Sequence, residues 1–294
     1  MKCRFCGSKK LIKRGKHSSN RQRVQCTECG KYDTPSRHPR SSKILLLDIE
    51  TLYMEVKGIW NLKQEYIQPS RIVKDWSILC YAAKWLFEPE IMGEVVTPKE
   101  AVSRTEKSII GGIWKLIDQA DIVITQNGIE FDIKRLNTKF FEHGYYPPSP
   151  YLMVDTLKVA REKFSFTSNK LDELGKKVLG LEGKMKMSEA DWDACAEGSQ
   201  VGLDKMLKYC KIDVAPLLED LYLRFLPWIS NHPNLNIYTN HDKDVCPKCE
   251  SLDLSWNTQY PTPQGLWQGF RCNACGAIGR GTKKEHKIKS TSVK

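Results

Sequence analysis

Residues 43–52 read KILLLDIETL, and this stretch determines the fold that we expect for the chain. The unbroken apolar run from Ile44 to Leu47 is typical of a buried β-strand. Asp48 and Glu50 interrupt the apolar pattern two residues apart, and residues i and i+2 of a strand point to the same face of a sheet. Two adjacent carboxylates repel each other unless a cation lies between them. The stretch therefore predicts a core strand that ends in a cation-binding site.

The charge of the chain is unevenly distributed. Its 294 residues carry a formal net charge of +11. Residues 1–43 hold thirteen Lys or Arg against two acids, residues 241–294 hold nine against five, and the centre holds twenty-four against twenty-eight. Basic ends favour a polyanionic partner, with basic tails kept for solubility as the alternative. Because no secretory signal and no apolar run of about 20 residues is found, we expect a soluble, cytoplasmic protein without membrane contact.

Eight of the eleven cysteines form four CxxC pairs, two at each end of the chain. Two such knuckles about twenty residues apart complete a tetrahedral four-thiolate site, which favours a structural zinc ion at each end over disulfides or redox chemistry. The predicted zinc ligands are Cys3, Cys6, Cys26 and Cys29, and Cys246, Cys249, Cys272 and Cys275. We expect zinc ribbons over residues 1–34 and 241–281, a linker over 35–42 and a basic tail over 282–294.

The N-terminal segment resembles the zinc ribbons that open some insertion-sequence transposase proteins. The resemblance covers about thirty residues and rests on the knuckles, Gly15 and the stretch RQRVQC (21–26). It implies contact with nucleic acid through Lys9, Lys10, Lys13, Arg14, Lys16, Arg21 and Arg23. A ribbon that binds protein or only caps a domain is the alternative. Phosphate contacts of this kind position a protein without reading the sequence.

The C-terminal ribbon carries aromatic side chains close to arginines. These residues are Trp256, Tyr260, Trp267, Phe270, Arg271 and Arg280. They could stack on single-stranded bases, and they could equally form the small core of the ribbon.

Between the two ribbons the pattern alternates between strand and helix. We predict strands over 44–49, 77–87 and 121–126, with a weaker one in the 53–60 region, and helices over 102–119, 130–142, 168–179 and 203–226. Ser168 and Asn169 are expected to cap the third helix. Pro216 should kink or restart the last one. The aggregate is an α/β fold, a sheet with helices packed on it.

Further carboxylates follow later elements of this pattern. Asp132 lies at the entrance to the helix that follows the strand 121–126. Tyr209 and Asp213 are four residues apart on a helix and therefore share a face. Four acids that converge on one site need cations of high charge density, and oxygen ligands select Mg²⁺ or Mn²⁺ over zinc. Two such ions are the usual machinery of phosphodiester hydrolysis.

The stretches DIET (48–51), NGIEFD (127–132) and YCKID (209–213) resemble the Exo I, Exo II and Exo III motifs of the DEDDy branch of the DnaQ-like 3′→5′ exonucleases. The flanks, including VDTLKVARE (154–162), are most similar to the proofreading domain of family B DNA polymerases and to related stand-alone phage and bacterial exonucleases. The resemblance covers roughly residues 43–226. It implies a ribonuclease H-like mixed sheet flanked by helices, which we place at residues 43–228.

The resemblance also implies a role for each motif residue. Asp48 would bridge two metal ions. Glu50 and Asp213 would complete the ion that activates the attacking water, Asp132 would hold the second ion, and Tyr209 would orient the water. The residues expected to contact the terminal nucleotide are Thr51, Leu52, Asn127 and Phe131. For Asp155 we favour a helix N-cap over a catalytic role.

The sequence thus predicts a metal-dependent 3′→5′ exonuclease that acts on DNA, with an RNA-directed enzyme as the alternative. A zinc-ribbon nucleic-acid-binding protein with an inactive core, regulatory or transposition-related, is the alternative from another class. The order of the acids, D-E-D-D, differs from the D-D-E order of a transposase of similar fold. Asp191 to Asp193 are expected in the loop before the last helix, a position from which they could touch substrate. Cys80, Cys195 and Cys210 are expected as buried or free thiols.

Overall fold

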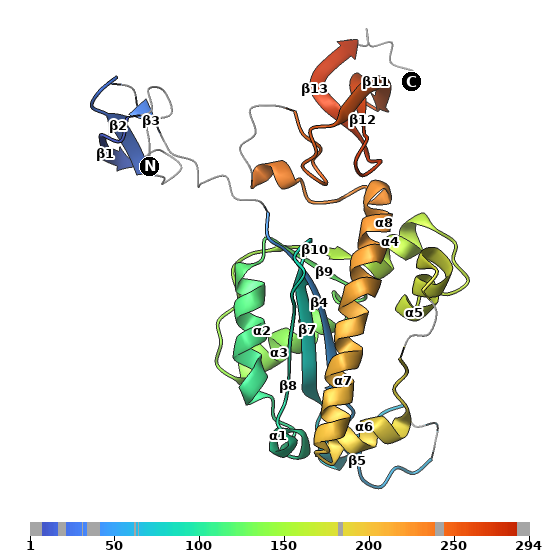
Figure 1. Cartoon of the computed structure of the whole chain (residues 1–294). Coiled ribbons are helices and arrows are strands. Elements are labelled where there is room, and N and C mark those ends of the chain that lie inside the picture. Colours follow the sequence, from blue (N-terminus) through green and yellow to red (C-terminus); the bar gives the residue numbers. More distant parts are fainter. Residues whose placement is uncertain are drawn as a thin grey trace.

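The computed structural model of the chain describes residues 8–16, 22–30, 32–33, 42–61, 63, 65–181, 185–238 and 244–286. A central domain with a five-stranded sheet carries a three-stranded sheet on either side of it in the sequence (Figure 1). None of the helices in these described ranges is long and apolar enough to cross a bilayer.

The central sheet has the strand order β10-β9-β4-β7-β8. β4 runs parallel to β9, and β9 runs parallel to β10, whereas β7 is antiparallel to both β4 and β8. The sheet is therefore mixed, with β4 at its centre. Its strands are β4 (Ile44–Leu52), β7 (Ser77–Trp85), β8 (Ile91–Val95), β9 (Ile122–Thr125) and β10 (Leu152–Asp155).

Helices cover both faces of this sheet (Figure 1). Asp48 pairs in register with Ala82, and Ala82 pairs with Gly93, so these three residues share a face of the sheet. A side chain at Gly93 would meet Leu207 and Lys211 of α7. Tyr81 points to the other face, where its hydroxyl lies beside Gly112 of α2. The helices of this domain are α1 (Pro98–Ser103), α2 (Lys107–Gln119), α3 (Asp132–Glu142), α4 (Thr156–Lys163), α5 (Leu171–Leu174), α6 (Glu189–Ala196), α7 (Gln200–Ile212) and α8 (Glu219–Phe225).

The two central strands form the middle of the core. Leu45, Leu46 and Leu47 of β4 are completely buried, because helices pack on both faces of the sheet. This double burial explains the continuous apolar run that opens the strand. The predicted α/β fold, a mixed sheet flanked by helices, is confirmed.

Several predicted elements differ from the structure in their extent. The first strand continues through Leu52. The weak strand predicted in the 53–60 region is reduced to β5 (Glu55–Val56), which pairs with β6 (Ile72–Lys74). The short 3₁₀ turn Pro69–Arg71 directly precedes β6. The predicted helix 102–119 is two helices, α1 and α2, because Arg104 adopts a left-handed conformation and ends α1. β8 and β10 were not predicted, since each is a short strand with little alternation.

The predicted helix 168–179 is wrong in both its form and its cap. It consists of the single turn α5 followed by the π-helical segment Gly175–Leu179, and Lys170 stands at its N-cap without a side-chain hydrogen bond. Ser168 Oγ instead accepts a hydrogen bond from the Lys170 N–H. Asp191 to Asp193 lie within α6 and not in a loop, because Ser188 and Asp191 form a capping box that starts a helix there.

The predicted interruption by Pro216 is confirmed. α7 ends at Ile212, and Ala215 leaves the helical region with φ −141° and ψ 117°. A π-helical segment, Asp213–Leu218, joins α7 to α8, and the 3₁₀ turns Leu226–Trp228 and Leu235–Ile237 follow. The kink separates one long predicted helix into two.

The two small sheets are antiparallel. The N-terminal one contains β1 (Leu11–Lys16), β2 (Gln22–Cys26) and β3 (Tyr32–Asp33), and the C-terminal one contains β11 (Leu254–Thr262), β12 (Gly265–Cys272) and β13 (Ile278–His286). The C-terminal sheet is attached to the central domain through Lys248, whose Nζ donates to the carbonyls of Leu226 and Pro227, at 3.2 Å each. The Leu235 N–H also donates to the Pro247 carbonyl at 2.8 Å.

Candidate active site

Asp48 and Glu50 lie on β4 and are separated by the buried Ile49. They pair in register with Ala82 and Cys80 of β7, and the register shifts only after Glu50. Regular pleating therefore holds up to Glu50 and directs both carboxylates to the face that α7 covers.

Asp213 approaches the same point from the end of α7. Ser199 caps the start of this helix, and its hydroxyl oxygen accepts from the Gly202 N–H at 3.3 Å. Asp213 keeps helical dihedral angles and is buried, just before the chain leaves the helix. Carboxylate oxygens of Asp48, Glu50 and Asp213 all lie within 4.8 Å of one another. We call these three residues the carboxylate triad.

Asp132 adjoins the triad from another element. It is the first residue of α3 and is 3% exposed, and its Oδ1 accepts a hydrogen bond from the Ile49 N–H at 3.1 Å. The negative charge of Asp132 acts on Asp48, although Asp132 is not one of the three residues whose oxygens converge within 4.8 Å. All four predicted acids thus gather around the middle of β4.

The turn before Asp132 has a special backbone. Asn127 adopts a left-handed φ of 67°. A Cβ at Gly128 would lie 2.3 Å from the Thr125 hydroxyl oxygen, so only glycine fits at this position. Asp155 fixes the turn, because its carboxylate accepts from the N–H groups of Asn127 at 2.9 Å and of Ile129 at 3.3 Å.

Asp155 has a second structural role. It is the N-cap of α4, where its Oδ1 accepts from the N–H groups of Leu157 at 3.0 Å and Lys158 at 3.4 Å. The N-cap interpretation is confirmed, and the link to the turn at Asn127 is an addition that the sequence did not indicate. One buried carboxylate therefore connects the start of α4 to the loop that delivers Asp132.

The clustered acids shift the pKa values of the site. Burial, then the charges of Asp132, Glu50 and Asp213, raise the pKa of Asp48 well above its usual range. Burial raises the pKa of Asp132 to about 7. Four neighbouring carboxylates, of which Asp132 and Asp213 are buried and Asp48 and Glu50 are half-buried, cannot all ionise cheaply without a cation. The donor set consists of hard oxygens, which fits divalent ions such as Mg²⁺ or Mn²⁺.

Tyr209 lies against the triad. Burial is the main cause that raises the pKa of its phenol, and the charges of Asp213, Glu50 and Asp48 add to it. The hydroxyl also hydrogen-bonds to the Asp213 side chain. The phenol therefore stays protonated across the physiological pH range and can act as a hydrogen-bond donor.

Cys210 is a site residue whose position the sequence did not reveal. Its thiol donates to Asp48, with its Sγ 3.5 Å from the carboxylate Oδ2 and 3.6 Å from the backbone carbonyl. The thiol is completely buried, as are those of Cys80 and Cys195. In the sequence, the only indication that Cys210 lies in the site is that it follows Tyr209 on a helix expected to face the site.

Two of the predicted substrate residues open a cavity beside the triad. Thr51 and Leu52, at the end of β4, line a cavity of about 680 Å³ together with Tyr53, Trp76, Arg135 and Trp192. We call it the β4-end cavity. Asn127 and Phe131 are not among the residues that line it, but the Arg135 guanidinium lies 4.4 Å from the centroid of the Phe131 ring.

The C-terminal cysteines form a compact cluster. The Sγ atoms of Cys246 and Cys275 are 3.7 Å apart, and those of Cys249 and Cys272 are 3.6 Å apart. Two sulfurs of a tetrahedral four-thiolate zinc site lie about 3.8 Å apart when each Zn–S bond is about 2.3 Å. The four cysteines therefore have the spacing that a zinc ion requires. Cys3 and Cys6 lie outside the described residues, so the N-terminal set is seen only at Cys26 and Cys29.

The aromatic residues of the C-terminal sheet divide between two roles. Phe270 is buried and packs on Trp256 with ring centroids 5.1 Å apart, which makes it part of the small core. Trp267 is half-buried, and the Arg280 guanidinium lies 4.1 Å from the centroid of its ring.

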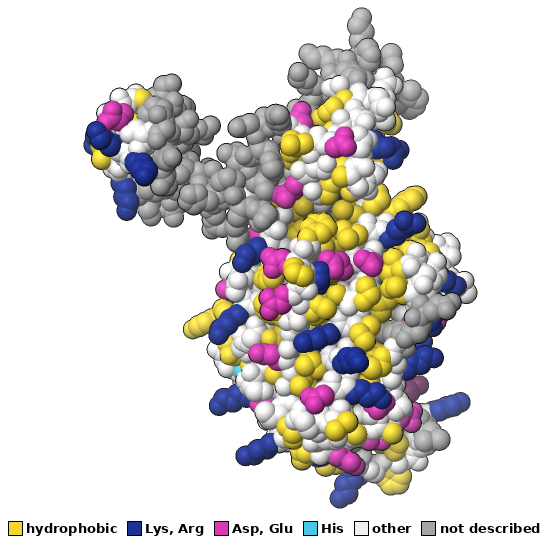
Figure 2. Space-filling view, viewed as in Figure 1, with side chains coloured by type: hydrophobic (Ala, Val, Ile, Leu, Met, Phe, Trp, Pro, Cys, Tyr) yellow, Lys and Arg dark blue, Asp and Glu magenta, His cyan; other side chains and the backbone are white. Residues whose placement is uncertain are grey.

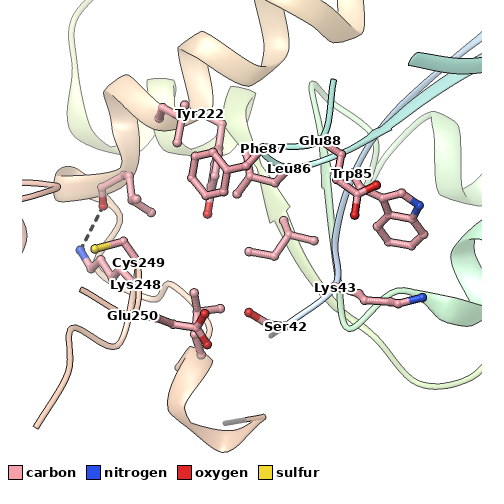
Figure 3. A pocket seen from close by; sticks show the side chains of 14 residues that line it. Ser42, Lys43, Trp85, Leu86, Phe87, Glu88, Tyr222, Lys248, Cys249 and Glu250 are labelled. Atoms are coloured by element: carbon pink, nitrogen blue, oxygen red, sulfur yellow. Dashed lines mark hydrogen bonds between the residues drawn. The ribbon is translucent and has the colours of Figure 1, made fainter. Parts of the chain in front are cut away.

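A second cavity, of about 540 Å³, lies where the C-terminal cysteine cluster meets the central domain. Lys248, Cys249 and Glu250 line one side, and residues around Leu86 and Tyr222 line the other (Figure 3). None of its lining residues belongs to the carboxylate triad.

On the face shown in Figure 2, Lys and Arg side chains of the central domain are interspersed with acidic ones and form no continuous basic surface.

Comparison with known proteins matches part of the chain to a known family. Residues 84–228 match the model of a family described as 3′-5′ exonuclease. The matched segment contains Asp132, Tyr209 and Asp213, whereas Asp48 and Glu50 precede it. No curated protein matches the chain.

Among solved structures, a family B DNA polymerase from the hyperthermophilic archaeon Pyrobaculum calidifontis is similar, with 14% sequence identity and a TM-score of 0.45. The match covers 74% of this chain and 28% of the polymerase chain, so the protein spans little more than a quarter of the polymerase's length. The match over residues 84–228, just under half of the chain, shows that this part is similar to 3′-5′ exonuclease domains, and it supports an exonuclease enzyme.

Proposed function

We propose that the protein is a metal-dependent 3′→5′ exonuclease of the DEDDy type that hydrolyses DNA by a two-metal-ion mechanism. The observation that supports this most strongly is the convergence of the carboxylate triad within 4.8 Å, with Asp132 beside it. Four neighbouring acids, two of them buried (Asp132 and Asp213), have a large electrostatic cost, which hard divalent ions would offset.

Each acid has a place in this proposal. Asp48, between the other acids, would hold both ions. Glu50 and Asp213 would complete the ion next to the attacking water, and Asp132 would hold the ion next to the leaving 3′ oxygen. Divalent ions held here would lower the pKa of a bound water and neutralise the charge that develops on the phosphate.

Tyr209 would orient the attacking water by a hydrogen bond. Burial and the charges of the neighbouring carboxylates raise the pKa of its phenol, so we assign Tyr209 a hydrogen-bonding role and not that of a general base. Cys210 would fix the orientation of the Asp48 carboxylate through the hydrogen bond that its thiol donates. Thr51, Leu52, Asn127 and Phe131 would contact the terminal nucleotide, with Thr51 and Leu52 nearest to the triad along β4.

The ribbons would hold nucleic acid and one structural zinc ion each. The sulfur spacing of the C-terminal cluster supports the ion there. We propose the domain limits 1–34, 43–228 and 241–281, joined by the linker 35–42 and followed by the basic tail 282–294. The basic residues of the N-terminal ribbon would bind phosphates, and this binding should weaken as salt rises.

The proposal is tested by incubating the full chain with 5′-labelled single- and double-stranded DNA and RNA in Mg²⁺ or Mn²⁺. We expect laddering from the 3′ end that stops in Asp48→Ala. Asp220→Ala, which removes an exposed acid of α8, is the control and should retain the rate. Preferential laddering of RNA would change the substrate class to RNA.

The alternative of a nucleic-acid-binding protein with an inactive core is tested by the same experiment. Under that alternative, the wild-type chain would bind DNA but hydrolyse none of the substrates in either metal. Binding that is unchanged in Asp48→Ala and Asp213→Ala, without any hydrolysis, would exclude the proposed enzyme.

A further inference from the structure

The hairpin that follows β4 displays large apolar side chains on the surface. Its stem is the antiparallel pair β5 and β6, and we call the described residues of the segment 57–71 the β5–β6 loop. Ile59, Trp60 and Tyr66 of this loop are 46%, 87% and 68% exposed. None of the described loop residues belongs to the hydrophobic core. Exposed apolar side chains that gather on one segment, unlike single scattered ones, indicate an interaction surface.

The stem of the loop is fixed to the central domain by polar contacts. The Glu55 carboxylate accepts a hydrogen bond from the Arg104 guanidinium at 2.6 Å and forms an ion pair with Lys74 at 3.2 Å. Where the stem begins, the Tyr53 hydroxyl donates a hydrogen bond to the Asp193 carboxylate of α6 at 2.5 Å. The exposed rings are therefore displayed from an anchored stem.

Backbone contacts also define the path of the loop itself. The Lys57 N–H donates to the Arg71 carbonyl at 2.9 Å, and the Lys63 N–H donates to Asn61 Oδ1 at 3.0 Å. Gly58 has a φ of 65°, a conformation that favours glycine. These contacts close the two ends of the loop on each other.

The charges of the loop favour a polyanionic partner. Lys57, Lys63 and Arg71 are exposed, and Glu65 is the one acid among the described loop residues. Glu55 of the stem is already paired with two cations. Exposed aromatic rings among cations are the combination with which proteins bind single-stranded nucleic acid without reading its sequence. An apolar protein surface would bury these cations at a cost, so nucleic acid fits the loop better than a protein partner.

The position of the loop relates it to the carboxylate triad. β4 carries Asp48 and Glu50 and leads into the stem, which lies beside α6 at the end of the central domain opposite the C-terminal sheet (Figure 1). Tyr53, where the stem begins, follows Glu50 by three residues, or about 10 Å at a strand rise of about 3.3 Å per residue. Because a stacked strand advances about 3.4 Å per nucleotide, the loop lies roughly three or more nucleotides from the reacting phosphate.

We propose that the β5–β6 loop binds the single strand behind its 3′ end, where Trp60 and Tyr66 stack on bases and Lys57 and Lys63 neutralise phosphates. This inference rests on the proposed exonuclease function and adds a substrate contact beyond the terminal nucleotide. Stacking of this kind accepts any sequence, because every base has a π face. A dinucleotide ends before it reaches the loop, whereas a strand of about 12 nucleotides extends past it. The length of the substrate therefore separates the loop from the carboxylates.

Hydrolysis of a 5′-labelled dinucleotide and of a strand of about 12 nucleotides tests the inference. Loss of one stacking ring lowers affinity by roughly 5- to 150-fold, so Trp60→Ala and Tyr66→Ala should each raise the KM for the longer strand by a factor in this range. Neither variant should change the KM for the dinucleotide or the kcat for either substrate. Trp60→Phe, which keeps an aromatic ring, should retain most of the preference for the longer strand. Lys57→Ala should reduce the slope of log affinity against log salt by roughly 0.7, the value for one phosphate of a single strand.

Exposed side chains on other elements provide matched controls. Phe141→Ala on α3 and Tyr146→Ala each remove an aromatic side chain that is 85% exposed. Lys115→Ala removes an exposed cation of α2. All three variants should keep the wild-type KM for both substrates and the wild-type dependence on salt.

A photochemical cross-link locates the strand without any hydrolysis. Single strands carry 5-iodouracil either at the 3′-terminal position or at an internal position beyond the third nucleotide from that end. They are irradiated with the full chain in Ca²⁺, and the adducts are mapped by mass spectrometry. We expect the internal 5-iodouracil to attach to Trp60 or Tyr66, and the terminal one to attach to neither.

Wild-type KM values in Trp60→Ala and Tyr66→Ala, together with no adduct in the loop, would overturn the inference while leaving the exonuclease proposal intact. Self-association of the wild-type chain in sedimentation measurements that is lost in Trp60→Ala would then assign the loop to a contact between copies. If the wild-type chain hydrolysed neither strand, the exonuclease proposal would fail, and the adduct pattern would still decide whether the strand lies on the loop.

Discussion

Removal of the Asp155 carboxylate should destabilise the protein more than any exposed substitution on the same helix. Asp155 is 4% exposed, and its two oxygens accept four backbone N–H groups. Two of these groups belong to the turn at Asn127, and two to the first turn of α4. In Asp155→Ala all four lose their acceptor.

The magnitude follows from these four bonds. A buried N–H without an acceptor costs about 1–3 kcal/mol, and the loss of an N-cap costs about 1 kcal/mol. Because water can reach part of the vacated space, we expect a total loss of about 3 kcal/mol in the free energy of unfolding. For a domain of 150–250 residues, each kcal/mol corresponds to roughly 2–4 °C in melting temperature. Asp155→Ala should therefore melt about 6–12 °C lower.

Thermal unfolding followed by circular dichroism measures this effect, with Glu162→Ala, an exposed acid of α4, as the control. Asp155→Asn keeps one acceptor oxygen and should lose about half as much. Below its melting temperature, Asp155→Ala should retain more exonuclease activity than Asp213→Asn. If Asp155→Ala melted like the wild-type chain and yet released no nucleotides, Asp155 would be a catalytic group and our structural interpretation would be wrong.

Three further changes should have distinct effects. Cys210→Ala should lower the exonuclease rate by roughly 10- to 100-fold, as for other partners that orient metal ligands. Cys210→Ser keeps a hydrogen-bond donor and should recover part of the lost rate. A rate for Cys210→Ala equal to that of the wild-type chain would refute a positioning role. Without divalent ions the chain should be more stable at pH 5 than at pH 8, because the pKa of Asp132 rises from near 4 in the unfolded state to about 7 in the folded state, so that the folded state binds more protons between these two values. Asp132→Asn should flatten the pH dependence of the free energy of unfolding measured by urea titration. An unchanged pH dependence in this variant would show that the pKa shift is absent. Cys272→Ser should reduce the bound zinc by about one ion per chain, measured by atomic absorption. The segment around Lys248, which contacts Leu226, should also become more sensitive to proteolysis in this variant. An unchanged zinc content would argue against the C-terminal site.

The main features of the fold could be predicted from the sequence because they depend on strong local patterns. The apolar run from Ile44 to Leu47 required a strand buried on both faces, and the spacing of Asp48 and Glu50 placed them on one face of it. Pro216 cannot donate a backbone hydrogen bond, so the interruption of the last helix could also be predicted. In each case a short stretch of neighbouring residues determines the local geometry.

Other features could not be predicted because they depend on tertiary contacts. Arg104 ends α1 in a left-handed conformation that its residue type does not favour. The contact between Tyr53 and Asp193 joins residues that are 140 positions apart. The same is true of the Cys210 thiol and Asp48, which lie 162 positions apart. Such pairs become visible only when the register of the sheet and the placement of α6 and α7 are known.

The central claim is that the carboxylate triad and Asp132 hold the ions that hydrolyse the 3′-terminal phosphodiester. The most direct measurement is the rate of nucleotide release from 5′-labelled single-stranded DNA across a range of Mn²⁺ concentrations, for the wild-type chain, Asp213→Asn and Asp220→Asn. We predict that the wild-type chain and Asp220→Asn release nucleotides from the 3′ end with the same Mn²⁺ dependence, and that Asp213→Asn releases none at any concentration. Equal rates for Asp213→Asn and the wild-type chain would contradict the account.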